Sequence, residues 1–124
     1  MGARFIQVAV VYLLIGVLLG MGMGMAEKFI YTSAHAHINL LGWATLGLIG
    51  VVYTVYPEAG STKLASVQFW LHNIGLPLLV ISMFLFAHGN TGLGIPFSAV
   101  GGLLVIVSVL LLVVNVFRHV KPRR

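Results

Sequence analysis

Four long apolar stretches, separated by short polar segments, occupy most of the chain. A bilayer core of about 30 Å requires roughly 20 apolar residues in a helix, and each stretch reaches that length. We therefore predict four transmembrane helices, at Phe5–Ala26, His35–Tyr56, Ser66–Ala87 and Pro96–Phe117. Little chain remains outside them, so the sequence predicts a single four-helix domain spanning residues 1–124.

The segments between these stretches are long enough only to reverse the chain. Glu27–Ala34 joins the first two stretches, Pro57–Gly60 ends the second, and His88–Gly94 follows the third. Short connections of this kind join neighbouring antiparallel helices. Proline is favoured in the first turn of a helix, which is where the prediction places Pro96. The expected fold class is an all-α membrane protein built as an antiparallel four-helix bundle.

The composition agrees with an integral membrane protein and removes several kinds of site. Hydrophobic residues make up 60% of the 124 residues and charged residues 7%, whereas soluble proteins have about 45–50% and about 25%. The chain has no cysteine. Disulfides, iron–sulfur clusters, thiolate zinc sites and covalently attached c-type heme are therefore excluded.

The charged residues predict how the chain sits in a membrane. A basic cluster immediately follows the last apolar stretch, and with two further bases it places six positive residues on one side, against Lys28 alone on the other. Cytoplasmic loops carry the excess of lysine and arginine. We expect both termini to be cytoplasmic, in the inner membrane of a bacterial-type cell, and we interpret the cluster as a topology signal rather than a nucleic-acid site. The six are Arg4, Lys63, Arg118, Lys121, Arg123 and Arg124.

Glycines and methionines alternate near the end of the first stretch. Glycines at a four-residue spacing share one helix face and allow another helix to approach closely; here they are Gly16, Gly20 and Gly24. Thioether sulfurs are soft ligands for Cu(I). Residues two apart on a helix point about 200° apart, so three alternating sulfurs converge only if the helix unwinds. These weaker metal candidates are Met21, Met23 and Met25.

The strongest candidate site is the segment AHAHINLLGW, residues 34–43, where polar side chains open an apolar stretch. Polar groups are costly in lipid and mark functional sites. On a helix His35 and His37 project about 200° apart, so each supplies a nitrogen to a different neighbour, as two axial heme ligands would. If residues 33–37 are extended, both face one side and chelate zinc or copper. A third interpretation is that both only hydrogen-bond water, headgroups or carbonyls near the membrane surface.

Two other histidines lie in or beside the third stretch. His88 ends it at a depth comparable to His35 and is a candidate third ligand for an outer-face metal site. His72 lies about 10 Å deep from the other side, at 1.5 Å per residue, and is therefore a poor partner for that metal. We expect it to hydrogen-bond a backbone carbonyl or Asn39, with a proton relay as the functional alternative.

The run from His35 to Trp43 resembles subunit I of the heme-copper oxidase superfamily, which includes cytochrome oxidases and nitric oxide reductases, and especially short relatives with a single bundle. The resemblance covers the first three helices. In that family the second helix carries a low-spin heme ligand near the outer side, and a later helix carries a His-x-His pair that serves two hemes. The resemblance therefore implies heme b as the cofactor, with His35 and His37 as its ligands.

The resemblance also implies an assembly. The family's large subunit arranges twelve helices as three arcs of four, and this chain supplies one arc, so a homotrimer would rebuild the ring. Each subunit boundary would then hold one heme b between His37 of one chain and His35 of the next. The family's oxygen-reducing copper requires three further histidines, one often linked to tyrosine, and no His-His pair occurs here. We do not expect this chain alone to be a complete oxidase or reductase.

Three functions remain open from the sequence. The first is a heme b protein that transfers electrons or senses a redox ligand, beside a respiratory-chain partner. The second is a heme-free copper or zinc protein that assists assembly of a respiratory complex through the same histidines and methionines. The third is a purely structural membrane subunit. All three place the chain among membrane lipids, with no nucleic-acid partner.

Overall fold

The computed structural model describes all 124 residues and is entirely helical, with no strand. Four spans are long and apolar enough to cross a membrane, which makes the chain a multi-pass helical membrane protein by length and composition. The first, third and fourth are single helices: α1 at Gly2–Ala26, α5 at Lys63–Ala87 and α6 at Thr91–His119. A short helix α4, Pro57–Gly60, lies between the second and third spans.

The second span, Phe29–Val55, is built from four consecutive pieces. It begins with a 3-10 turn, η1 at Phe29–Tyr31, and continues as helix α2 at Thr32–His37. A π-helical segment, η2 at Ile38–Ala44, follows, and helix α3 at Thr45–Val55 completes the span. The histidine pair lies immediately before the π-helical segment.

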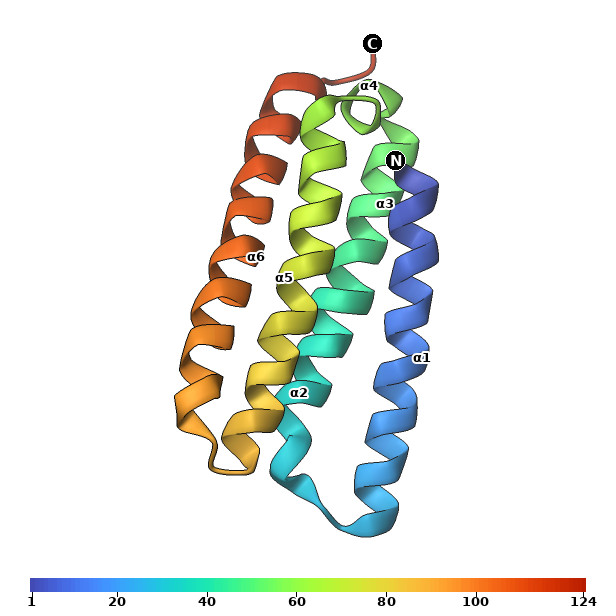
Figure 1. The fold of residues 1–124 in the computed structure, drawn as a ribbon. Helices are drawn as coiled ribbons and strands as arrows, with labels where there is room; N and C mark the ends of the chain where they lie inside the picture. Colours follow the sequence, from blue (N-terminus) through green and yellow to red (C-terminus); the bar gives the residue numbers. More distant parts are fainter.

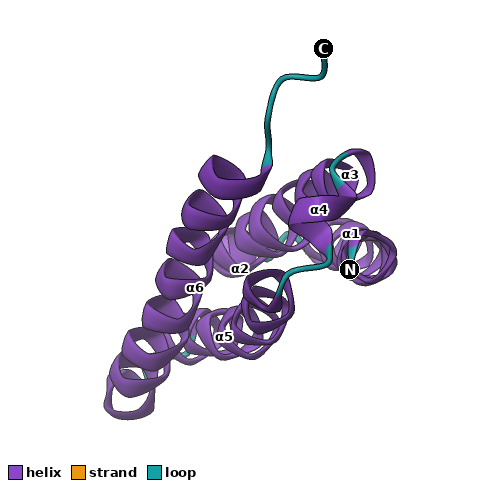
Figure 2. Ribbon diagram, turned by 90° about the horizontal axis from the view of Figure 1, so that it is seen from above, coloured by secondary structure: helices purple, strands orange, loops and turns teal.

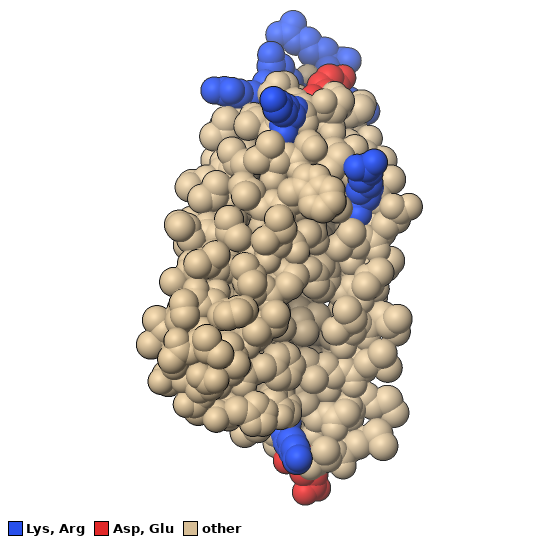
Figure 3. Space-filling view, viewed as in Figure 1, with Lys and Arg blue, Asp and Glu red and all other residues tan.

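The chain runs back and forth along one direction (Figure 1). It descends α1, returns through α2 and α3, descends α5 and returns along α6, so that both termini lie at one end of the molecule. Lysine and arginine gather at this end, and a single basic group stands beside a carboxylate at the other (Figure 3). We call the end with both termini, α4 and the start of α5 the basic end.

All four spans begin earlier than the sequence prediction, α1 and α5 by three residues and the other two by five or more. The second span begins at Phe29 rather than His35, because the 3-10 turn brings the connecting segment into the helix. The fourth begins at Thr91 rather than Pro96, because the Asn90 side chain accepts a hydrogen bond from the Leu93 amide at 3.2 Å and caps the helix. Pro96 therefore lies in the second turn of α6 and does not open it.

Helix α6 packs mainly against α5, and seen from above it forms one edge of the molecule (Figure 2). The two helices meet at glycines: a Cβ on Gly75 would lie 2.9 Å from the Gly101 carbonyl oxygen. A Cβ on Gly101 would lie 2.5 Å from the Leu79 amide nitrogen. The two backbones are therefore in direct contact, which only glycine permits at this separation.

An aromatic cluster and a polar network fill the interior near the basic end. The ring of Phe5 from α1 meets Tyr53 and Phe69 edge-on, with centroid distances of 5.5 and 5.1 Å. The Tyr53 hydroxyl donates to the Gln68 side-chain oxygen, and the Asn115 amide donates to the Tyr53 oxygen at 2.9 Å. All four spans therefore meet here.

Candidate functional site

The π-helical segment η2 follows directly after the histidines in the second span. The Asn39 amide donates to the His35 carbonyl at 2.8 Å, and the Thr45 hydroxyl donates to the Leu40 carbonyl at 2.7 Å. A π-helical turn leaves carbonyls free for partners outside the helix, and such turns are frequent at functional sites. The sequence did not predict this segment.

His35 is partly buried between α2 and α1. Its Nδ1–H donates to the Gly16 carbonyl at 2.9 Å, since a carbonyl can only accept, and the Asn39 amide nitrogen lies 3.2 Å from the same Nδ1. The ring lies against Gly20, where a Cβ would come within 2.6 Å of Cε1. A Cβ on Gly16 would come within 2.5 Å of the Asn39 side-chain oxygen. The glycines therefore make room for His35 and Asn39, which is the signal that could have linked these residues in the sequence.

His37 is held in the same way but by its own helix. Its Nδ1–H donates to the Ser33 carbonyl at 2.8 Å. Both imidazoles therefore carry their proton on Nδ1 when neutral, and in both the Nε2 lone pair has no partner within the chain. A histidine that binds a metal typically donates its other ring N–H to a backbone carbonyl in this manner.

One sequence-based alternative is wrong. The extended conformation of residues 33–37, which would have placed both imidazoles on one side, does not occur, because Thr32–His37 is a helix. Side chains two apart on a helix project to nearly opposite sides. His35 and His37 therefore face different neighbours, and a zinc or copper ion chelated by this pair within one chain is not supported.

His88 lies near the second span, but its ring nitrogen is already engaged. Its Nε2 is hydrogen-bonded to the Tyr31 hydroxyl at 2.8 Å, and the two rings lie 5.7 Å apart. Nowhere do three or more His, Cys, Asp or Glu side chains gather as a metal-binding group. The structure therefore does not bring His88 together with His35 and His37 as a three-histidine cluster.

The three methionines lie on an uninterrupted helix. Met21 and Met25 are exposed, whereas Met23 between them is buried. Because α1 continues to Ala26, the unwinding that would let the three sulfurs converge does not occur. These side chains do not form a common thioether site within the chain.

His72 is fully buried and joins three spans. Its Nε2–H donates to the Leu41 carbonyl in η2 at 2.9 Å, and its Nδ1 lies 3.1 Å from the Ser108 hydroxyl of α6. The predicted bond to a backbone carbonyl is confirmed. The predicted alternative partner was wrong, because Asn39 bonds the His35 carbonyl and faces α1 instead. The role of His72 as a proton relay stays a prediction.

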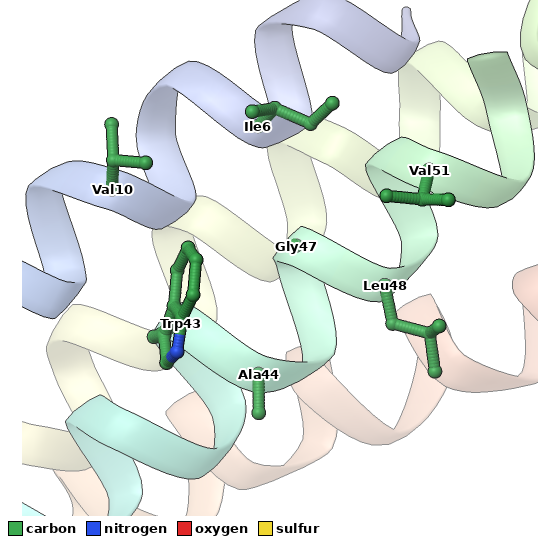
Figure 4. A pocket seen from close by; sticks show the side chains of 7 residues that line it. All are labelled: Ile6, Val10, Trp43, Ala44, Gly47, Leu48 and Val51. Carbon is green, nitrogen blue, oxygen red and sulfur yellow. The ribbon is translucent and has the colours of Figure 1, made fainter.

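The cavities of the single chain lie away from the two histidines. The groove shown in Figure 4 has a volume of about 370 Å³ and runs between α1 and the second span. The Trp43 ring stands at one end of it, with Ile6 and Val10 along the α1 side and Gly47 between the two helices. A larger groove of about 420 Å³ separates α1 from α5. None of the five cavities is lined by His35 or His37.

The fold and these contacts define a four-span helical membrane protein with two imidazole nitrogens free at the end opposite the termini. No protein-family model, curated protein or solved structure matches the chain.

Proposed function

We propose that this chain is a membrane heme b protein that transfers electrons or senses a redox ligand, with His35 and His37 as axial ligands. The observation that carries the proposal is the shared state of the two imidazoles. Each donates Nδ1–H to a backbone carbonyl, at 2.9 Å for His35 and 2.8 Å for His37, and each keeps its Nε2 lone pair free. This arrangement orients the ring and raises the basicity of the ligating nitrogen.

The absence of an internal cavity beside either histidine implies that a second surface takes part. A macrocycle held by His37 would rest against the apolar exterior of the chain, where Leu40 is 63% exposed. Another protein surface would have to cover its other face. A second copy of this chain supplies both that surface and a second imidazole, so we propose a homotrimer that resembles the heme-copper oxidase ring, with His37 of one chain and His35 of the next at each boundary.

The proposed residues have distinct parts in this site. His35 is the rigid ligand, because Gly16 and Gly20 confine its ring against α1. His37 is held only through its own helix. When bound between two imidazoles, heme b supplies one-electron transfer without an open coordination position. We therefore propose an electron-transfer or sensing role beside a respiratory-chain partner, and not a complete oxidase or reductase.

The test is the absorption spectrum of the purified protein, oxidised and dithionite-reduced, together with metal analysis. Wild type is compared with His35→Ala and His37→Ala, and with His119→Ala as a matched control, since that side chain lies at the C-terminal end of α6, at the other end of the molecule. We expect a heme b spectrum in wild type and in His119→Ala that is lost or converted to a single-histidine form in either of the other variants.

The remaining outcomes separate the alternatives. Copper or zinc without heme, lost in the same two variants, would assign the free nitrogens to a metal ion and refute the heme. A protein with no cofactor, whose assembly and stability tolerate both alanines, would be a structural subunit. Heme that persists in both variants would place the ligands elsewhere in the chain.

A further inference from the structure

A further pocket lies at the basic end and is far more polar than the grooves between the helices. It has a volume of about 260 Å³ and lies between the residues that follow α3, the start of α4, and the end of α6 with the C-terminal tail. Five of its six lining residues are polar, aromatic or charged. The six lining residues are Tyr56, Glu58, His119, Lys121, Pro122 and Arg123, of which only Pro122 lacks a polar side chain.

The Arg123 guanidinium makes two contacts at this pocket. Its guanidinium donates to the Val55 carbonyl, the last residue of α3, and lies over the Tyr56 ring at 5.4 Å from the centroid. Helix ends leave carbonyls without partners, and a cation there also offsets the helix dipole. A guanidinium has five N–H donors. Most of them remain available to a ligand.

Among the neighbouring side chains, Lys121 adds positive charge and N–H donors to the pocket. His119 Nδ1–H donates to the Asn115 carbonyl at 3.1 Å, which orients the ring and leaves Nε2 without a partner in the chain. Lys121 is exposed on the pocket wall. Glu58 is the one opposing charge, and Arg123 bonds the Val55 carbonyl rather than this carboxylate. Arg118 and Arg124 raise the local potential further.

The pocket also sits at a defined depth. It lies at the ends of α3 and α6, two membrane-length spans, where Tyr56 occupies the position of an interfacial aromatic residue. Phospholipid phosphates lie at this level. Arginine matches phosphate geometry, and basic pockets between helices at this level bind anionic lipid headgroups. We propose that this pocket is a binding site for the phosphate of an anionic phospholipid headgroup.

The test is lipid binding by the full chain, purified in detergent and followed by native mass spectrometry. Phosphatidylglycerol is compared with phosphatidylcholine of identical acyl chains, so that only the headgroup differs. We expect preferential binding of phosphatidylglycerol, weakened about fivefold for each pocket charge removed and about 25-fold in the double variant Lys121→Gln/Arg123→Gln. Glu58→Gln should strengthen binding, because it removes the opposing charge.

Two further variants distinguish binding in this pocket from general attraction to a positively charged surface. Arg4→Gln removes a charge at the same end but outside the pocket, and Lys28→Gln removes one at the opposite end. Both should leave phosphatidylglycerol binding nearly unchanged. An equal loss in Arg4→Gln, or no preference for phosphatidylglycerol over phosphatidylcholine, would overturn the proposal. Glu58→Gln keeps the proposal testable if the double variant fails to fold, because weaker or unaltered binding there would also contradict it.

Inorganic phosphate carries the same chemical group that the pocket would recognise in the lipid. A competition experiment therefore tests whether the site takes the lipid or free phosphate. Inorganic phosphate at millimolar concentration is added to the protein bound to phosphatidylglycerol. Displacement from wild type would show that the site takes phosphate itself, without acyl chains. Retention of the lipid, with the headgroup preference intact, would assign the site to the membrane lipid.

Discussion

Gly20 and Gly22 lie two residues apart in α1, and only Gly20 faces another side chain. A methyl group on Gly20 would come within 2.6 Å of the His35 ring, whereas one on Gly22 would meet nothing within 4 Å. Gly20→Ala should therefore displace the imidazole and destabilise the protein by about 1–3 kcal/mol. Gly22→Ala should be neutral or stabilising by up to about 1 kcal/mol, because alanine favours the helix.

The pair is measured by denaturant unfolding in detergent micelles. The comparison isolates the contact, since both substitutions add one methyl group to the same helix. Equal stability of the two variants would show that the His35 ring does not occupy the place described here. If the chain binds heme b as proposed, Gly20→Ala should also alter the spectrum while Gly22→Ala leaves it unchanged.

His72 and Asn73 are adjacent, yet their side chains differ in what they bond. His72 joins η2 to α6 through the Leu41 carbonyl and the Ser108 hydroxyl. Asn73 bonds only the Phe69 carbonyl of its own helix, and its side-chain oxygen is buried without a partner. We expect His72→Leu to destabilise the chain by about 1–3 kcal/mol, because it leaves the Leu41 carbonyl unpaired.

Asn73→Leu should instead change stability by less than about 0.5 kcal/mol or increase it, because it removes an unpaired buried oxygen. Thermal unfolding of the two variants in the same detergent checks both values. A large loss in Asn73→Leu would indicate that this oxygen has a partner outside the single chain, and a neutral His72→Leu would remove the structural role assigned to that imidazole.

At this scale the sequence identified the histidines but not their partners. His35, His37 and His72 stand out because polar side chains are rare in apolar stretches. Which carbonyl each one meets depends on the rotation and depth of a neighbouring helix. The spacing of Gly16 and Gly20 predicted close packing, yet it was a side chain and not a helix backbone that filled the space.

Among the elements, α6 is hydrogen-bonded to α4 through the side chain of Asn115. Asn115 is fully buried, and its amide donates to the Ala59 carbonyl at 3.0 Å and to the Tyr53 hydroxyl oxygen at 2.9 Å. Its oxygen accepts from the Thr62 hydroxyl at 3.1 Å. Asn115→Leu removes all three bonds at once.

We expect Asn115→Leu to lower stability by about 1–2 kcal/mol, within the range measured for side-chain hydrogen bonds in membranes. Val114→Leu is the matched control, since it lies next to Asn115 but is 39% exposed on the outer surface. Unfolding of both variants under the same conditions is the measurement. A loss as large in Val114→Leu would assign the effect to α6 as a whole and not to the network.

The elements were predictable to the extent that local signals define them. Four spans followed from apolar length alone, and α1 and α5 begin within a few residues of the prediction. The predicted start of α6 at Pro96 was wrong, because the Asn90 side chain caps the helix and the helix begins at Thr91. The π-helical segment had no recognised local signal, because one of its carbonyls is satisfied by His72 from a distant part of the chain.

For the whole molecule, the charge distribution predicts the orientation in the membrane. Both termini and most basic groups share one end, and lysine and arginine favour the cytoplasmic side. A C-terminal fluorescent-protein fusion should therefore be fluorescent in a bacterial host, and an alkaline phosphatase fusion at the same position should be inactive. The reverse pattern would show that the chain has the opposite orientation, with the His35 and His37 end in the cytoplasm.

The proposed assembly makes a prediction that neither single variant can test. If each heme lies between His37 of one chain and His35 of the next, a mixture of His35→Ala and His37→Ala chains rebuilds complete boundaries wherever the two variants meet in the right order. In a randomly mixed, equimolar trimer about one boundary in four has both imidazoles. Co-expressed variants should then recover roughly a quarter of the wild-type heme, although each alone has no complete site.

A site formed within one chain predicts no recovery, since every chain in the mixture lacks one ligand. The heme content of the co-purified complex, compared with that of the two proteins mixed after purification, decides between these arrangements.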